Sequence, residues 1–207
     1  MKKLAILLLA LLPLYAWAQD NTWEKPEEEE TTVEEAKVKV NPDAKYLKGA
    51  VPEMDGKIVF AKTIEAPGKT ASETYAIVKK YVQKMVGEKN QISSQVVTDE
   101  EASHHLVATF DEWLVFKSNA IMLDRTQLLY VLQATCHDGK ADISISRIRY
   151  FYGEGKDQQR YTAEEWISDK VAVNKKNTKL LPLSAKFRRK TVDRKDFLFN
   201  KFETLLK

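Results

Sequence analysis

Side chains that can bind a metal or act as a nucleophile are scarce: the sequence has three histidines and one cysteine. His104 and His105 are neighbours on a predicted strand, where successive side chains point to opposite faces, so they are badly placed to bind one metal together. We interpret His137 as a solvated residue beside a turn. Cys136 falls on the predicted buried face, whereas a nucleophilic thiol needs an exposed, electropositive setting. We therefore predict that Cys136 is a core residue. Only a cleft shared with a histidine would favour an enzyme.

The carboxylates do not form an obvious acid and base pair either. Glu100 adjoins Glu101 and Asp111 adjoins Glu112, but adjacent residues on strands or turns seldom converge on one substrate. We interpret both pairs as parts of a solvated edge or loop. The sequence shows no Ser, His and Asp set, and its 7 glycines form no phosphate-binding loop. It therefore predicts no catalytic residue, no cofactor and no metal site.

Residues 1–18 have the pattern of a secretory signal peptide. Lys2 and Lys3 precede an apolar run of about a dozen residues, and the small residues Ala16 and Ala18 predict cleavage after position 18. A membrane anchor is disfavoured because the run is shorter than about 20 residues and contains Pro13. No cysteine follows the cleavage site, which disfavours a lipoprotein anchor. We predict an exported chain, periplasmic or on the outer surface, that is soluble after cleavage.

The charge is unevenly distributed along the chain. The net charge is +3 for the whole sequence, or about +1 without Lys2 and Lys3, which is too small to indicate a nucleic-acid partner. Residues 19–50 are rich in glutamate and predict an acidic flexible lead, which could instead fold back on the basic C-terminal end. The basic end could bind acidic lipid or polysaccharide, but such a run is more often a solvated helix face.

The folded domain is predicted to span residues 51–207 and to open with a strand and a helix. Ile58 and Phe60 lie on the strand. Thr70 and Glu73 form a capping box, which predicts a helix from there to about Val86. Its apolar stripe has helical spacing and predicts packing against a sheet: Ala71, Thr74, Tyr75, Val78, Tyr81, Val82 and Met85.

Four strands are predicted next, at about 93–98, 105–116, 126–137 and 140–153, with a break in the second strand around Asp111 and Glu112. Asp138 and Gly139 predict a two-residue hairpin turn of type I′. Counting outward from this turn sets the register. The expected pairs on one buried face are Cys136 with Ala141, Ala134 with Ile143 and Leu132 with Ile145.

The stretch ADISISRIRYFYG, residues 141–153, changes its apolar phase between Ser146 and Arg147. Without an irregularity, Arg147 and Arg149 would be buried, at a cost of several kcal/mol each. A β-bulge, in which Ser146 and Arg147 together oppose Val131, turns both arginines outward. It sets Tyr130, Leu128 and Thr126 opposite Ile148, Tyr150 and Tyr152. A bulged and bent strand of this kind suits a sheet that curves around a helix.

The remainder of the chain is predicted to be helical. Thr162 and Glu165 form a second capping box, followed by a helix through Val171. After a loop, a last helix is predicted to be capped by Thr191 or Asp193. Its apolar face is Leu198, Phe202, Leu205 and Leu206, and its basic face is Lys186, Arg188, Arg189, Lys190, Arg194 and Lys195. The predicted fold class is α+β: a curved antiparallel sheet packs on the first helix, and C-terminal helices cover an edge or the second face.

Three segments resemble the bacterial domain of unknown function family 4468, which is described as having a TBP-like fold. They are PEMDGKIVFAKTIEAPGKTASETYAIVKKYV, the hairpin CHDGKADISISRIRYFY and the ending KFRRKTVDRKDFLFNKF. The resemblance covers about residues 51–205. It implies a secreted or periplasmic protein of Gram-negative envelopes. It supplies no activity and no catalytic residues.

Two functional hypotheses follow. The first is a non-catalytic binding or protein-interaction module, whose surface would be the outward row Arg147, Arg149 and Phe151 beside Leu129 and Val131. A covering C-terminal helix is the interpretation of this row that we favour at this stage. The alternative is a carrier of a small apolar ligand held between helix and sheet, in a cavity lined by Tyr75, Tyr81, Tyr130 and Tyr150. The sequence leaves the partner and the oligomeric state open.

Overall fold

The computed structural model describes residues 41–207, so the predicted signal peptide and residues 19–40 of the lead lie outside the described residues. A six-stranded antiparallel sheet has the order β3-β7-β6-β5-β4, and β8 pairs with the remaining length of β7. Its strands are β3 (Phe60–Glu65), β4 (Gln95–Glu100), β5 (His105–Ser118), β6 (Leu123–His137), β7 (Lys140–Tyr152) and β8 (Gln159–Thr162). The long helices are α1 (Ala71–Val86) and α4 (Pro182–Leu206).

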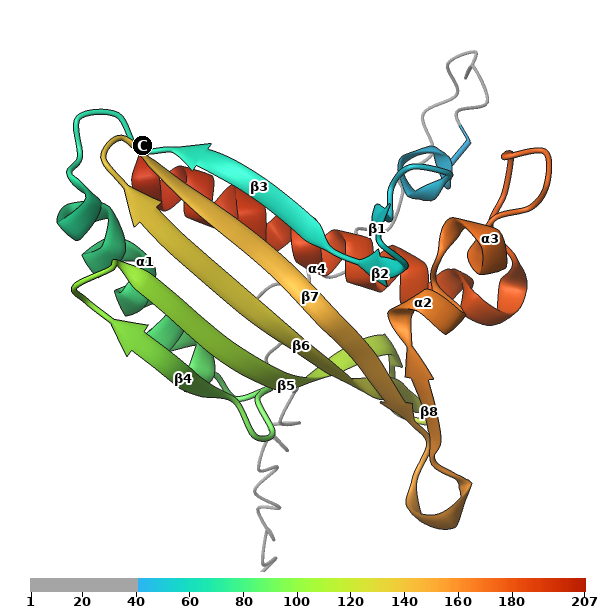
Figure 1. Cartoon of the computed structure of the whole chain (residues 1–207). Coiled ribbons are helices and arrows are strands. Elements are labelled where there is room, and N and C mark those ends of the chain that lie inside the picture. The colour runs from blue at the N-terminus through green and yellow to red at the C-terminus, as the bar shows by residue number, and fades with distance from the viewer. Residues whose placement is uncertain (1–40) are drawn as a thin grey trace, which may run out of the picture.

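The smaller elements lie between these. They are η1 (Ala44–Tyr46), the strands β1 (Glu53–Met54) and β2 (Lys57–Ile58), η2 (Gly155–Asp157), α2 (Ala163–Trp166) and α3 (Asp169–Ala172). Figure 1 shows both long helices behind the sheet, on the same side of it. One hydrophobic cluster joins the buried faces of α1, α4 and the sheet. The predicted α+β class is therefore confirmed, but α4 shares the face that α1 covers, where we expected it at an edge or on the second face.

Helix α1 begins where its capping box predicts. The Thr70 hydroxyl accepts a hydrogen bond from the Glu73 amide, and the Glu73 carboxylate accepts one from the Thr70 amide. The predicted stripe faces the sheet, because Thr74, Tyr75, Val78, Tyr81, Val82 and Met85 are all buried. Burying five apolar side chains stabilises the domain by roughly 1.5–3 kcal/mol each, so this stripe accounts for the placement of the helix.

The β6–β7 hairpin has the predicted register, with Cys136 opposite Ala141 and Leu132 opposite Ile145. Its turn is not type I′, because Gly139 has a positive φ of 75° while Asp138 does not. Instead, the Asp138 carboxylate accepts a 2.7 Å hydrogen bond from the Ala71 amide, and Gly139 exchanges backbone hydrogen bonds with Lys69 and Ala66. The turn is thus shaped by its contact with the start of α1, a tertiary contact that turn propensity does not report.

The predicted β-bulge in β7 is confirmed. Val131 pairs with Ser146 and Leu129 with Arg149, so one residue of β6 faces two of β7. Arg147 is the extra residue and has a φ of 55°, in the left-handed region. Arg147 and Arg149 are both exposed, while Ile148 and Tyr150 are buried. The bulge therefore keeps two cations out of the core, as the phase change indicates.

Two predicted boundaries were wrong. Strand β5 continues through Asp111 and Glu112 without a break, because Glu112 finds a buried cationic partner on α4. Helix α4 does not start at Thr191 or Asp193 but at Pro182, which occupies the first turn, where its missing N–H costs nothing. The second capping box at Thr162 and Glu165 is confirmed, although α2 ends after one turn and the chain continues as α3.

The segment 41–50, which we predicted to be part of the flexible lead, packs against α4. Arg188 donates to the carbonyls of Tyr46 and Leu47, at 2.6 and 2.8 Å, and Arg189 binds the Asp43 carboxylate at 2.7 Å. The Tyr46 hydroxyl donates to Asp193 at 2.9 Å. The final residues of the lead thus do contact the basic helix, whereas the boundary at residue 50 and the rest of the lead stay predictions.

The bulge gives a direct test of backbone strain. We expect Arg147→Gly to raise Tm by about 1–3 °C, because glycine tolerates a left-handed φ that costs other residues about 1–2 kcal/mol. Arg147→Val should lower Tm, since a β-branched side chain fits this region worst. Arg149→Gly is the matched control on the same strand and should lower Tm. Thermal unfolding by circular dichroism measures all three. An increase with both glycine variants would contradict a strained Arg147.

Candidate functional site

The predicted surface row lies on the sheet face opposite both long helices. Arg147 and Arg149 are exposed, and Phe151 is half-buried. We favoured a C-terminal helix covering this row, and that interpretation was wrong: α4 contributes its buried side chains to the core on the other face. Within residues 41–207, no helix covers this face, which Figure 1 shows toward the viewer. We call it the open face.

Strand pairing arranges the side chains of the open face in rows across four strands. Trp113 of β5, Gln127 of β6, Phe151 of β7 and Arg160 of β8 are successive neighbours. The next row is Asp111, Leu129, Arg149 and Thr162. Cross-strand neighbours of this kind lie about 4.5–5.5 Å apart at their Cβ atoms, so each row forms a continuous strip.

Two arginines of the open face stack on its aromatic rings. The Arg125 guanidinium lies 3.6 Å from the centre of the Trp113 ring, and that of Arg160 lies 5.0 Å from the centre of the Phe151 ring. A guanidinium over the face of a ring is attracted by the ring and keeps N–H groups that can donate to a partner. Together with Arg147 and Arg149, these pairs make one half of the open face both cationic and apolar.

Asp111 is the acid of this half of the face, and its environment is unusual. The Oδ1 atom is buried and accepts no hydrogen bond within the described part of the chain. Burial, helped by the neighbouring carboxylate of Glu112, raises the pKa of Asp111 above its ordinary 3.8. An ionised carboxylate without a donor is destabilising, so Asp111 is a group that a bound partner could satisfy.

The histidines and the cysteine lie apart from this half of the face. Ser72 contacts the His104 ring at 2.9 Å, His105 contacts Thr135 at 3.0 Å on the open face, and His137 lies 3.3 Å from Asp142. No group of three His, Cys, Asp or Glu residues able to hold a metal occurs in residues 41–207. Cys136 is buried in the core as predicted, and burial raises the pKa of its thiol to about 11.

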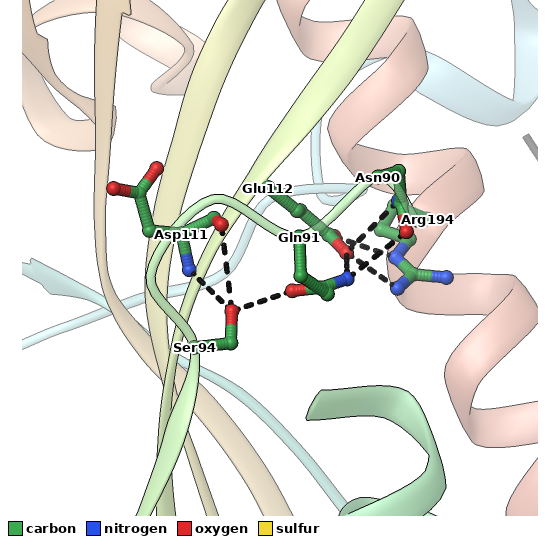
Figure 2. A network of polar contacts seen from close by, with 6 residues as sticks. All are labelled: Asn90, Gln91, Ser94, Asp111, Glu112 and Arg194. Carbon is green, nitrogen blue, oxygen red and sulfur yellow. Dashed lines mark hydrogen bonds and ion pairs between the residues drawn. The ribbon is translucent and has the colours of Figure 1, made fainter. Parts of the chain in front are cut away.

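A network of polar contacts that includes a buried ion pair lies between β5 and α4 (Figure 2). Arg194 of α4 binds Glu112 of β5 through two hydrogen bonds of 2.7 Å, and both residues are almost fully buried. Gln91 donates to Glu112 at 2.8 Å, and Asn90 contacts the same carboxylate at 3.5 Å. Burial alone would lower the pKa of Arg194, but the Glu112 carboxylate outweighs it and raises that pKa. We interpret the Glu112–Arg194 pair as a structural interaction that holds α4 against β5.

The same network reaches toward the open face through Ser94. Its hydroxyl donates to Gln91 and accepts a hydrogen bond of 2.9 Å from the Asp111 amide. Figure 2 shows the Asp111 carboxylate pointing away from this network, while Glu112 points into it. The interpretation of Asp111 and Glu112 as a solvated edge was therefore wrong for Glu112. Their opposite directions follow from the alternation of a continuous strand.

The basic face of α4 is largely used within the domain. Arg188 is fully buried and binds Asp169 at 2.6 Å in addition to the carbonyls already described. Lys186 binds Asp124 at 2.7 Å, and Arg189 binds Asp43. With Arg194 bound to Glu112, four of the six basic residues of the predicted face stabilise the fold. This overturns the expectation of a solvated helix face.

The four tyrosines of the carrier hypothesis are packing residues. Tyr130 stacks on Phe110 with ring centres 4.9 Å apart, and Tyr81 packs edge-on against Phe202 at 5.2 Å. Tyr150 contacts Phe187, and Tyr75 contacts His104. The space between α4 and the sheet beside Tyr130 amounts to about 10 Å³, which holds one water molecule at most.

Similarity to a solved structure shows which family the chain belongs to. A DUF4468 family protein from Bacteroides ovatus is 40% identical, with a TM-score of 0.73, and the match covers 79% of this chain and 94% of that one. The chain belongs to the DUF4468 family. The family, described as a domain of unknown function with TBP-like fold, matches residues 60–151 of this DUF4468 chain. A TBP-like protein from Parabacteroides distasonis is 20% identical, with a TM-score of 0.61 over 76% of this chain and 97% of that one, and shares the fold. No curated protein matches significantly.

Membership agrees with the resemblance of the sequence, and the matched region contains the β5, β6 and β7 residues of the open face and Glu112 of the buried pair. Residues 60–151 of the DUF4468 chain include Trp113, Arg125, Arg149 and Phe151, whereas Arg160 and Arg194 follow the matched region. No helix in residues 41–207 is long and apolar enough to cross a membrane.

Sequence reasoning missed the residues that complete the site. Trp113 and Arg125 were not singled out, because their contact depends on β5–β6 pairing, which places Trp113 opposite Gln127. Strict alternation through Phe110, Glu112 and Leu114 could have indicated that Glu112 points inward. Its partner Arg194 carries no such signal, since a long cationic side chain on a helix is ordinarily solvated.

In the DUF4468 chain, removing one partner of the buried Glu112–Arg194 pair should cost more stability than replacing both partners. We expect Glu112→Gln to lower the free energy of unfolding by about 3–5 kcal/mol, because it leaves Arg194 buried without a counter-charge. The double variant Glu112→Leu with Arg194→Met should recover most of this loss. Urea denaturation followed by fluorescence measures both. Equal losses in the single and the double variant would show that packing, not charge, dominates.

The raised pKa of Asp111 predicts that the stability of the domain depends on pH. Because its folded-state pKa is raised, the proton is held more tightly in the folded state, and this stabilisation is lost as the pH rises from 3.8 through the folded-state pKa. Asp111→Asn should therefore raise Tm by about 2 °C at pH 7 and by much less at pH 3. Glu101→Gln, at an exposed position, is the control. The same change at both pH values would contradict an unsatisfied carboxylate.

Proposed function

We propose that this DUF4468 protein is a non-catalytic interaction module that acts outside the cytoplasm and binds an acidic segment of a partner protein on its open face. The observation that carries the proposal is the uncovered strip in which Arg125 and Arg160 stack on Trp113 and Phe151. Arginine and large aromatic side chains are the types most enriched in the energetic centres of protein interfaces.

The charge of the strip supports an acidic partner. Arg125, Arg147, Arg149 and Arg160 lie on it, and none of them forms an ion pair with the described part of the chain. This contrasts with Arg188 and Arg194, which internal acids neutralise. Leu129 and Val131 between the arginines supply half-buried apolar area. Cations around an apolar centre complement a segment that carries both carboxylates and apolar side chains.

The other hypotheses have less support. A carrier needs a cavity, whereas the tyrosines that would line it pack against other rings and the space beside Tyr130 admits one water molecule at most. A cysteine enzyme needs an accessible thiolate, whereas Cys136 is buried with a raised pKa. Export rests on the signal pattern of residues 1–18.

The experiment is site-specific photocrosslinking in the native host. A photoreactive residue replaces Phe151, and a control replaces Gln83 on the exposed side of α1. We expect one reproducible crosslink from position 151, with the crosslinked peptide of the partner rich in Asp and Glu, and none from position 83. Arg147→Glu with Arg149→Glu should reduce its yield at least tenfold, equivalent to about 1.4 kcal/mol.

Charge reversal on the other side of the domain provides the matched control. Lys80→Glu with Lys84→Glu changes two exposed cations of α1 and should leave the crosslink unchanged. Equal loss in both double variants would overturn a specific open-face interface. A crosslink from position 151 to residues 19–40 of the same chain would also overturn the proposal, because the acidic lead would then be the occupant.

A further inference from the structure

Exposed apolar side chains concentrate at the tip of the β5–β6 hairpin. Ile121 is 97% exposed, Met122 52% and Leu123 49%. Nine large hydrophobic residues are exposed in residues 41–207, and these three are consecutive. Single exposed apolar residues are ordinary on protein surfaces, but a contiguous group is a recognised sign of a binding surface. We call Ile121, Met122 and Leu123 the apolar tip.

Local hydrogen bonds fix the conformation of the apolar tip. The side-chain oxygen of Asn119 accepts hydrogen bonds from the amides of Ile121, at 3.0 Å, and Met122, at 2.8 Å. The Asn119 amide donates to the Met122 carbonyl at 2.9 Å. Asparagine commonly closes turns in this way. The apolar side chains are thus presented on a formed turn, so little ordering is needed when they bind.

An aromatic cluster supports the base of the same hairpin. Phe116 of β5 packs edge-on against Phe187 of α4 with ring centres 4.7 Å apart, and against Tyr152 of β7 at 6.1 Å. Lys186 extends over the rings of Phe116 and Tyr152, at 4.6 and 4.4 Å. This packing joins the hairpin to the first turns of α4.

The start of α4 adds a further apolar group at this end of the domain. Leu183 is 79% exposed and lies one helical turn before Lys186. The Lys186 ammonium binds the carboxylate of Asp124 at 2.7 Å, and Asp124 directly follows Leu123 in the chain. Leu183 therefore belongs to the same end of the molecule as the apolar tip.

Cations flank the apolar tip. Lys117 is exposed and pairs across the hairpin with Asp124, and Arg125 follows Asp124 on β6. Lys117, Arg125 and Lys186 thus surround a single acid, Asp124. Apolar side chains flanked by cations match a lipid surface, where acyl chains lie beneath negatively charged headgroups.

We propose that the apolar tip inserts into a membrane surface that contains anionic lipids, so that the domain is held peripherally at that surface. A stable protein interface buries about 800 Å² on each partner, more than three side chains on a turn can offer. A lipid surface needs no such complementary area, because reversible binding scales with the apolar area inserted and with the attraction between cations and headgroups. The flank of the tip shares Arg125 with the arginine and aromatic strip, but Ile121, Met122 and Leu123 lie beyond the strip at the end of the hairpin, so variants of these residues test this binding separately from the interaction proposed for the open face.

The test is vesicle co-sedimentation of the chain without residues 1–18, because that apolar segment would bind lipid by itself. The probes are vesicles of phosphatidylcholine with phosphatidylglycerol, 3:1, and of phosphatidylcholine alone. We expect binding to the anionic vesicles, at least tenfold weaker binding to the neutral ones, and at least tenfold weaker binding of Ile121→Ser with Met122→Ser. The matched control, Ile92→Ser with Val97→Ser, removes two exposed apolar residues elsewhere and should bind as the original chain does.

A second measurement does not depend on comparing affinities. Met122→Cys provides an accessible thiol for an environment-sensitive dye, while Cys136 is buried and unreactive in the folded chain. Anionic vesicles should shift the emission of a dye at position 122 to the blue, and should not shift that of a dye at Val97→Cys.

Three outcomes would overturn the proposal: tip variants that bind vesicles like the original chain, no shift at position 122, or equal binding to neutral and anionic vesicles. Loss of self-association in the tip variants, without vesicle binding by the original chain, would assign the tip to an interface between copies. Unchanged Tm values establish that the variants are folded.

Discussion

The arrangement of this domain depends on a carboxylate that has been removed from water. Glu112 lies on the buried face of β5, within the long β5–β6 pairing, and Arg194 compensates its charge through two hydrogen bonds. Because both carboxylate oxygens accept hydrogen bonds from Arg194, the pair constrains the position and rotation of α4 over β5. Arg188 acts similarly nearer the start of the helix, where its guanidinium binds backbone carbonyls of residues 46, 47 and 167. Two buried guanidinium groups thus place a helix whose apolar residues alone would allow it to slide.

Placing α4 beside α1 determines which surface remains for binding. Both helices use the same side of the sheet, so the core is closed on that side and the other side faces solvent in the described part of the chain. The bulge at Arg147 contributes by shifting the phase of β7, which keeps Tyr150 in the core and Arg149 outside. Packing and surface chemistry are therefore linked: the same irregularity that fills the core supplies the cations of the open face.

Features set by residues that are close in sequence were predicted, whereas features set by residues that are distant in sequence were not. Local signals were reliable: the Thr70 and Thr162 capping boxes, the α1 stripe and the Ser146–Arg147 phase change each depend on neighbouring residues, and each is present. Long-range features were not predictable. The Asp138 turn responds to α1, the burial of Arg194 depends on Glu112, 82 positions earlier, and Trp113 meets Arg125 only through strand pairing. The Arg147, Arg149 and Phe151 row was found because it is a consequence of the bulge.

The contact between the two ends of the described chain governs when folding can be completed. The segment around Tyr46 is held by Arg188, β3 pairs with β7, and the Lys69 ammonium binds the Leu206 carbonyl near the last residue. A nascent chain that ends before Pro182 has its strands, but it has neither Arg194 as a counter-charge for Glu112 nor Arg188 to hold the segment around Tyr46. The packing around Glu112 can therefore be completed only after synthesis has reached α4, and it depends on contacts distant in sequence, which slow folding.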